Sequence, residues 1–162
     1  MDNMKQLIDQ ISKRSDCVIN PAMGLPQLSE NHVLPEELSE FYKLAGGAVL
    51  FQDSEQPYTI LSPEEFQQSD IAIAGEVNED SISSNWYVIV MDGNGDYLSI
   101  NCAKEKTGYC YDTYHELYAM VGRTAIIATS FSELLTQLLA NNGESSYWLK
   151  DDFVTLGDAY DL

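Results

Sequence analysis

Hydrophobic residues recur at helical spacing in three stretches of the chain: residues 2–13, 35–45 and 131–140. Each stretch is predicted to form a helix with one buried stripe. Ser130 and Glu133 have the spacing of a capping box at the start of the third helix. The pair Gly46-Gly47 is expected to end the second helix with a left-handed cap and a sharp exit into a strand.

Short apolar runs predict the strands of a sheet at residues 49–51, 58–61, 86–91, 97–102, 108–111 and 125–128. The run WYVIVM, which starts at Trp86, does not alternate between apolar and polar residues. This is typical of a central strand that is covered on both faces. The run that starts at Tyr97 does alternate, with Leu98 and Ile100 on one face and Ser99 on the other. It is therefore expected to have one apolar and one polar face.

Other segments have weaker patterns. Residues 17–32 contain proline and glycine and are predicted to form an ordered connector. Ser62 followed by Pro63 is predicted to start a short helix, with the serine as its N-cap. Residues 68–85 are polar and weakly patterned, and we expect them to be the most mobile loop. The segment 144–162 carries apolar residues at roughly helical spacing and is expected to pack back on the domain.

The acidic sequence DGNGD raises a choice between a calcium loop and a β-turn. Asp92, Asn94 and Asp96 match the first three ligand positions of an EF-hand loop. The sixth position of that loop requires glycine, but here it is Tyr97. The twelfth requires glutamate, but here it is Ala103. A glycine-rich turn between two strand-like runs instead predicts a β-hairpin, and we expect no metal and no cofactor.

The charge of the chain excludes some classes of partner. The chain has 162 residues, which suits one domain over residues 1–162, and its formal net charge is −18. This charge disfavours binding to nucleic acid and to anionic membranes, and it attracts basic proteins. Solubility alone is the other explanation of the charge. The sequence shows no membrane-length apolar run and no signal peptide, so a cytoplasmic location is expected.

No nucleophile–base arrangement can be recognised in the sequence, and we therefore expect no enzyme activity. Cys17, Cys102 and Cys110 are widely spaced, lack a C-x-x-C motif and are predicted to be buried thiols. A catalytic cysteine would need a histidine and an orienting acid close to it. His32 and His115 have no partner at a spacing typical of metal ligands.

Three motifs together suggest a family. LP..L..FY...GG starts at Leu34, W.V...DG.GD.L.I starts at Trp86, and SF.E.L..L starts at Ser130. In this order they resemble the SUKH superfamily, with the resemblance covering roughly residues 30–140. The resemblance implies a compact α+β domain with a mainly antiparallel β-sheet flanked by helices, and no catalytic site. Bacterial members bind and neutralise secreted toxins, often nucleases, and the eukaryotic branch regulates cell-wall synthesis.

The leading hypothesis is thus a bacterial immunity protein that binds a basic toxin domain, as a monomer or weak homodimer. The alternative is an intracellular adaptor of the cell-wall regulator type. Trp86 is expected to pack in the core, or else to line a binding cleft. Among the acidic candidates we favour the loop at residues 76–80. The candidate partner-binding residues are Glu64, Glu65, Glu76, Glu79, Asp80, Trp86, Asp92, Asp96 and Tyr97.

Overall fold

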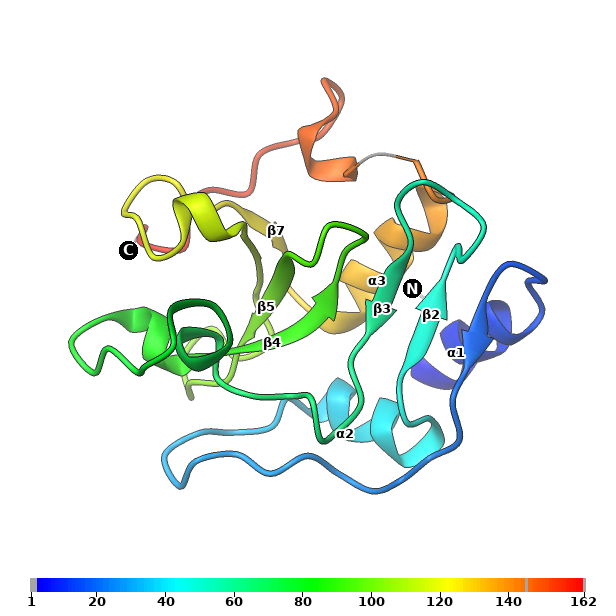
Figure 1. Cartoon of the computed structure of the whole chain (residues 1–162), viewed down its shortest axis with the longest axis horizontal. Helices are drawn as coiled ribbons and strands as arrows, with labels where there is room; N and C mark the ends of the chain where they lie inside the picture. Colours follow the sequence, from blue (N-terminus) through cyan, green and yellow to red (C-terminus); the bar gives the residue numbers. More distant parts are fainter. Residues whose placement is uncertain (1–2, 145, 162) are drawn as a thin grey trace.

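A seven-stranded antiparallel sheet forms the frame of the protein (Figure 1). The computed structural model describes residues 3–144 and 146–161. The strands follow one another across the sheet in sequence order, and every neighbouring pair is antiparallel. They are β1 (Val18–Ile19), β2 (Ala48–Leu50), β3 (Tyr58–Ile60), β4 (Trp86–Met91), β5 (Tyr97–Asn101), β6 (Cys110–Thr113) and β7 (Ile126–Ala128).

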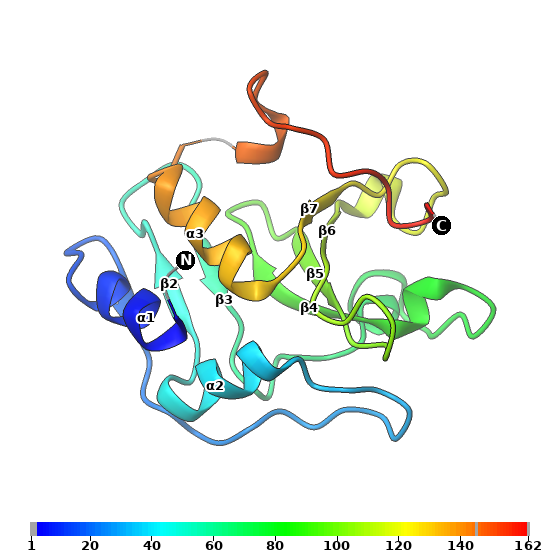
Figure 2. The same ribbon diagram turned by 180° about the vertical axis from the view of Figure 1, so that it is seen from behind.

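Three helices cover one face of this sheet, as Figure 2 shows: α1 (Met4–Ser12), α2 (Glu36–Leu44) and α3 (Phe131–Ala140). Their apolar stripes and the facing strand residues form the main core, in which Leu38, Phe41 and Leu134 are fully buried. The Ser130 side chain accepts a hydrogen bond from the backbone N–H of Glu133, as the capping pattern predicted. The α+β fold with helices flanking an antiparallel sheet is therefore confirmed.

The end of α2 differs from the predicted left-handed cap. The helix ends at Leu44, and the next residue, Ala45, is already extended with φ −149°. The residue with positive φ is Gly47, at +118°. Gly46 is required for a different reason, because a Cβ atom there would lie 2.2 Å from the carbonyl oxygen of Pro21. The glycine pair therefore lets the connector pass close to the start of β2.

Two predictions before β4 were wrong in detail. The connector at 17–32 begins with strand β1, whose two residues were too few to give a pattern. Ser62 and Glu65 do exchange the hydrogen bonds of a capping box, but only a single turn follows. Gln67 and Gln68 already pair with β4, so the chain has no length left to continue the helix.

The segment at 68–85 contains regular structure that its composition did not predict. It holds a π-helix, η1 (Asp70–Ala74), and a 3₁₀ helix, η2 (Ile82–Asn85). The buried Asp70 carboxylate accepts hydrogen bonds from the Tyr118 hydroxyl at 2.6 Å and from the Asn78 backbone N–H at 2.9 Å. This segment covers part of the second face of the sheet, opposite the helices (Figure 1).

The polar face of β5 is buried beneath this segment. The hydroxyl of Ser99 lies 2.7 Å from that of Ser69 and 2.8 Å from that of Thr113, and all three residues are buried. Because these hydroxyl groups satisfy one another, a polar strand face can be covered at little cost. The predicted alternation of β5 is correct, and both of its faces are buried over Ser99 and Ile100.

The C-terminal segment packs back on the domain, as predicted. In the 3₁₀ helix η4 (Tyr147–Leu149), the Tyr147 hydroxyl donates to the carbonyl oxygen of Ile127 at 2.6 Å. Further along, Ala159 donates a backbone hydrogen bond to Thr124 at 2.8 Å. Among the described residues, no helix is long and apolar enough to cross a membrane.

Candidate functional site

The tip of the β4–β5 hairpin holds two of the predicted site residues in fixed positions. The Asp92 carboxylate accepts hydrogen bonds from the backbone N–H groups of Asn94 at 2.8 Å and of Asp96 at 3.0 Å. Gly95 has φ +85°, a conformation that glycine adopts at low cost. The predicted hairpin is therefore confirmed, and one oxygen of Asp92 is used to hold the turn.

Asp96 forms an ion pair with the 3₁₀ helix η3 (His115–Leu117). One carboxylate oxygen lies 2.6 Å from the Nδ1 atom of His115 and also accepts the His115 backbone N–H at 3.1 Å. The hydrogen bond that the imidazole donates to the Asp96 carboxylate raises the pKa of His115 above its ordinary value of 6.5. This contact joins the hairpin to the segment that follows β6.

The titration of His115 should report this contact. In a proton NMR titration, we expect the His115 midpoint to lie above 6.5. Asp96→Asn should lower it, since the amide keeps a hydrogen-bond acceptor but loses the charge. While the Asp96 carboxylate is charged, the ion pair contributes its full stabilisation below pH 6.5, and this contribution is lost as the pH rises through the raised pKa. A midpoint that Asp96→Asn leaves unchanged would show that the contact does not form in solution.

A third carboxylate, that of Asp112 on β6, lies near the hairpin. Burial raises its pKa above the ordinary value, and the nearby charges of Asp92 and Asp96 act in the same direction. The indole N–H of Trp148 donates a hydrogen bond to it at 3.0 Å and opposes the increase. In residues 3–144 and 146–161, no group of three or more His, Cys, Asp or Glu side chains is placed to hold a metal ion.

The strand register aligns a row of side chains across the sheet face opposite the helices. Val49 lies opposite Thr59, which in turn lies opposite Met91. Met91 lies opposite Tyr97, and Val18 on β1 extends the row beyond Val49. Residues paired in this way point to the same face of a sheet. We call these five residues the open-face row.

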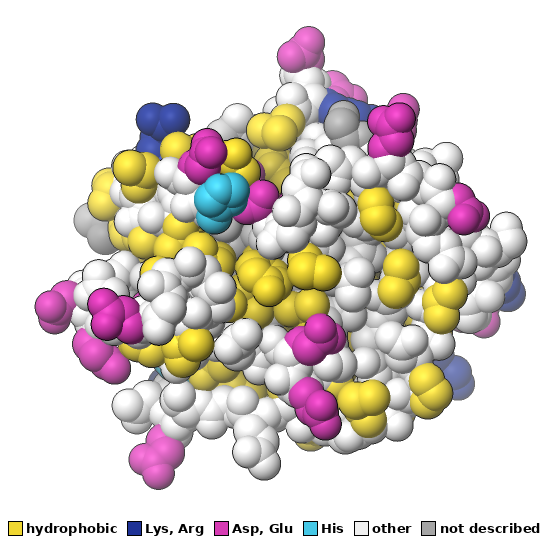
Figure 3. Space-filling model, in the orientation of Figure 1, with side chains coloured by type: hydrophobic (Ala, Val, Ile, Leu, Met, Phe, Trp, Pro, Cys, Tyr) yellow, Lys and Arg dark blue, Asp and Glu magenta, His cyan; other side chains and the backbone are white. Residues whose placement is uncertain are grey.

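The open-face row is accessible to a partner. Val18 is 41% exposed and its other four members are half-buried. Figure 3 shows hydrophobic side chains gathered in the middle of this face, with acidic side chains both beside them and near the outline. At one end of the row, a pocket of about 200 Å³ is lined by Tyr97, Thr113 and His115 and by Ala72 and Ile73 of η1.

The other predicted acidic residues lie away from the hairpin tip. Glu76, Glu79 and Asp80 are exposed in the loop between η1 and η2. Glu64 and Glu65 are exposed in the turn that follows β3. Of the predicted site residues, the structure brings together only the three of the hairpin.

Trp86 has no accessible surface. Its side chain is 0% exposed and packs against Tyr111 with ring centroids 4.8 Å apart. Tyr118 and Tyr160 lie edge-on to it, each at 6.1 Å. This arrangement matches the expectation of core packing. A direct contact between Trp86 and a partner would require this aromatic cluster to open.

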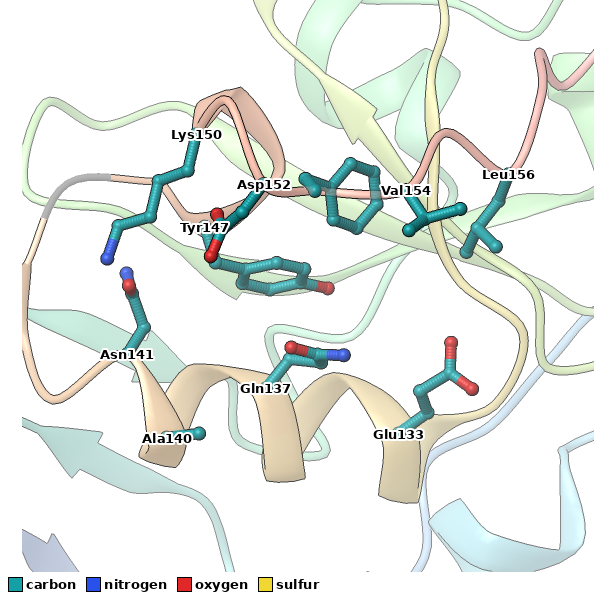
Figure 4. Close-up of a pocket in the computed structure, with 10 residues that line it drawn as sticks. Glu133, Gln137, Ala140, Asn141, Tyr147, Lys150, Asp152, Val154 and Leu156 are labelled. Carbon is teal, nitrogen blue, oxygen red and sulfur yellow. The ribbon is translucent and has the colours of Figure 1, made fainter.

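A second concave region lies between α3 and the C-terminal segment, with a volume of about 510 Å³ (Figure 4). Glu133 and Gln137 approach it from the helix, and Lys150, Asp152 and Val154 approach it from the opposite side. Its described lining residues include no histidine, cysteine or serine. They therefore cannot form a Ser–His or Cys–His pair.

The three cysteines are buried and free, as predicted. Burial raises the pKa of the Cys17 and Cys102 thiols above the ordinary value of 9.0 and raises that of Cys110 well above it. A thiol with a raised pKa stays protonated at neutral pH and is a poor nucleophile. The geometry therefore supports a structural role for these side chains.

Sequence reasoning missed the open-face row and the role of His115. The row depends on the register between strands, and no pattern within one strand shows that register. His115 and Asp96 are 19 positions apart, and they meet because Tyr97 of β5 pairs with Thr113 of β6. The tyrosine of the hairpin was the only member of the row that was predicted as a site residue.

Comparisons with known proteins identify the family of the chain. The family model described as "SMI1 / KNR4 family (SUKH-1)" matches residues 27–137. The chain is also 45% identical over 159 residues to the Immunity protein YokJ of Bacillus subtilis (strain 168), with 98% of this chain and 96% of that relative covered. No solved structure matches the chain. The family match covers most of the chain and confirms the resemblance seen in its motifs: the chain belongs to the SMI1/KNR4 family (SUKH-1).

Proposed function

We propose that this chain is an immunity protein that neutralises a toxin by binding it directly. The observation that carries this proposal is the 45% identity to the Immunity protein YokJ over 98% of this chain and 96% of that relative. The alignment includes every strand and helix of the domain, so both chains can present the same surfaces. Protection by binding requires no catalysis, and the buried, protonated cysteines support a non-enzymatic role.

We further propose that the toxin domain is basic, as a nuclease that binds phosphate groups is expected to be. The net charge of −18 supports this, since opposite charges steer two proteins together and speed their association. An acidic inhibitor can also occupy the surface that would otherwise bind the substrate. In this proposal the two proteins meet in the cytoplasm of the protected cell.

Co-expression tests the proposal. Any toxic domain that is found encoded beside the gene for this chain is expressed in a host cell with and without the chain, and an unrelated toxic domain serves as the control. We expect growth to be restored only for the neighbouring toxin, and the purified pair to form a stable complex. Raising the salt concentration should slow association by about tenfold or more if the attraction is electrostatic.

The same experiment can reject the proposal. A folded chain that neither restores growth nor binds this toxin would exclude direct neutralisation of that toxin. If binding occurs without salt dependence, neutralisation stands, but the electrostatic part of the proposal is wrong. A triple variant, Glu76→Gln, Glu79→Gln and Asp80→Asn, separately tests whether the exposed loop contributes to the association rate.

A further inference from the structure

One long stretch of the chain carries acidic residues but no basic ones, and it supplies much of the open face of the sheet. Residues 44–103 contain no lysine or arginine. These residues supply β2 to β5 and the segment beside them on the open face. Ten acidic residues lie in the same stretch: Asp53, Glu55, Glu64, Glu65, Asp70, Glu76, Glu79, Asp80, Asp92 and Asp96.

Nine of these ten acidic residues lie outside the core, since only Asp70 is buried. Two loops bring part of them to the same end of the sheet. A Cβ atom on Gly93 would lie 3.0 Å from the Pro57 ring and 3.4 Å from the carbonyl oxygen of Glu55, so the β2–β3 loop touches the hairpin tip. Asp53 and Glu55 of that loop are exposed.

The open-face row is the apolar centre of this acidic region. Val49, Thr59, Met91 and Tyr97 stand on four neighbouring strands and are only half-covered. In Figure 3 the middle of the face is hydrophobic, and Lys and Arg side chains appear only near the outline of the molecule. An apolar centre with a charged rim is the usual composition of a protein–protein interface.

We propose that the open-face row and its acidic rim form the docking surface for the toxin domain. The partner surface that fits is an apolar side chain, or a short apolar strip, flanked by lysine or arginine side chains. The apolar part would cover Thr59 and Met91, and the cations would reach Asp92 and Asp96. This inference rests on the proposed function, and it adds the face and the chemistry of the contact.

Charge decides between this occupant and a second copy of the chain. Two copies that met through this face would bring the same acidic rims together, and like charges across an interface disfavour binding. The rim favours a basic protein for the same reason. The groove between α3 and the C-terminal segment is a weaker candidate, because it contains Lys150, which forms an ion pair with Glu144.

Oxidation of methionine in the wild-type protein tests the surface without a mutation. Met91 belongs to the open-face row, whereas Met120 is 50% exposed and lies outside it. The chain is treated with dilute peroxide alone and in complex with the neighbouring toxin domain, and both oxidation rates are read by mass spectrometry. We expect the complex to slow oxidation of Met91 at least fivefold and to leave Met120 unchanged.

A matched pair of substitutions gives the second readout. Thr59→Arg places a long cation in the middle of the row, and Val154→Arg places the same side chain on a residue that is 78% exposed beside the α3 groove. We expect Thr59→Arg to weaken toxin binding at least 100-fold and Val154→Arg to change it less than threefold. Circular dichroism and thermal unfolding check that both variants are folded.

The possible failures can be told apart. If the wild-type chain does not bind the toxin, the proposed function fails. If it binds but Met91 is oxidised as fast in the complex as in the free chain, the docking surface is wrong and the proposed function stands. Loss of binding in Val154→Arg alone would also overturn the surface and move the interface to the α3 groove. If a high concentration of the chain alone protects Met91, the occupant is a second copy and the surface assigned to the toxin is wrong.

Discussion

Replacing Trp86 by alanine is expected to lower the free energy of unfolding by about 3–5 kcal/mol, the range observed when a buried large aromatic side chain is removed. The side chain is 0% exposed and is surrounded by Tyr111, Tyr118 and Tyr160. These rings come from three separate segments, one of which is strand β6. We therefore expect them not to fill the cavity that the missing indole would leave. Urea unfolding at equilibrium, followed by circular dichroism, measures the loss.

Trp86→Phe is the matched control for this prediction. The indole N–H of Trp86 is buried and has no hydrogen-bond partner among residues 3–144 and 146–161. Leaving such a group unpaired costs about 1–3 kcal/mol, so its removal offsets part of the lost packing. We therefore expect the phenylalanine variant to lose only about 1–2 kcal/mol of stability.

Toxin binding separates a core role of Trp86 from a contact role. Both variants should bind the toxin with unchanged affinity under conditions in which they are folded. If Trp86→Ala costs less than about 1 kcal/mol of stability but abolishes binding, the tryptophan is a contact residue and its aromatic cluster opens in the complex.

The features predicted best from the sequence are those that depend on local patterns. The stripe of α2, the cap of α3 and the hairpin between β4 and β5 all follow from residue types at fixed spacing. Strand β6 starts two residues after the predicted run, at Cys110. Its register is set by pairing with β5 and β7, and such pairing is decided by tertiary contacts.

The burial of polar residues could not be predicted from composition. Residues 68–85 resemble a solvated loop because serine and aspartate are usually exposed. In the structure Ser69 and Asp70 find partners on β5 and near η3, so their burial leaves no unsatisfied group on these side chains. Ser99 lies 30 positions from Ser69, and Tyr118 lies 48 positions from Asp70, so no local sequence pattern could show these contacts.

The candidate site was predicted in part for a similar reason. Asp92, Asp96 and Tyr97 stand out because they flank a turn in a β-rich region. Val49 and Thr59 come to lie in one row with Tyr97 only after three antiparallel pairings are in place. The absence of basic residues from 44–103 can be read from the sequence. Its meaning depends on the fold, because only the sheet order shows that alternate residues of β2 to β5 lie side by side on the open face.

Replacing Gly47 by alanine is expected to lower the free energy of unfolding by about 3–4 kcal/mol, as the sum of backbone strain and a steric clash. Gly47 has φ +118°, and a Cβ atom there would lie 2.7 Å from the carbonyl oxygen of Ile60. Ile60 pairs with Ala48 and with Val90, so its backbone is held from both sides. Neither strand can move away without breaking pairs in the centre of the sheet.

Gly24→Ala isolates the steric part of this loss. Gly24 has φ +102°, close to that of Gly47, but no atom in the described part of the chain would lie within 4 Å of a Cβ atom there. Its replacement should cost only the strain of positive φ, about 1–2 kcal/mol. The difference between the two variants in urea unfolding therefore measures the contact with Ile60. Equal losses would mean that β2 and β3 shift to accommodate the added methyl group. These strands carry Val49 and Thr59 of the proposed docking surface, so that surface would then be flexible.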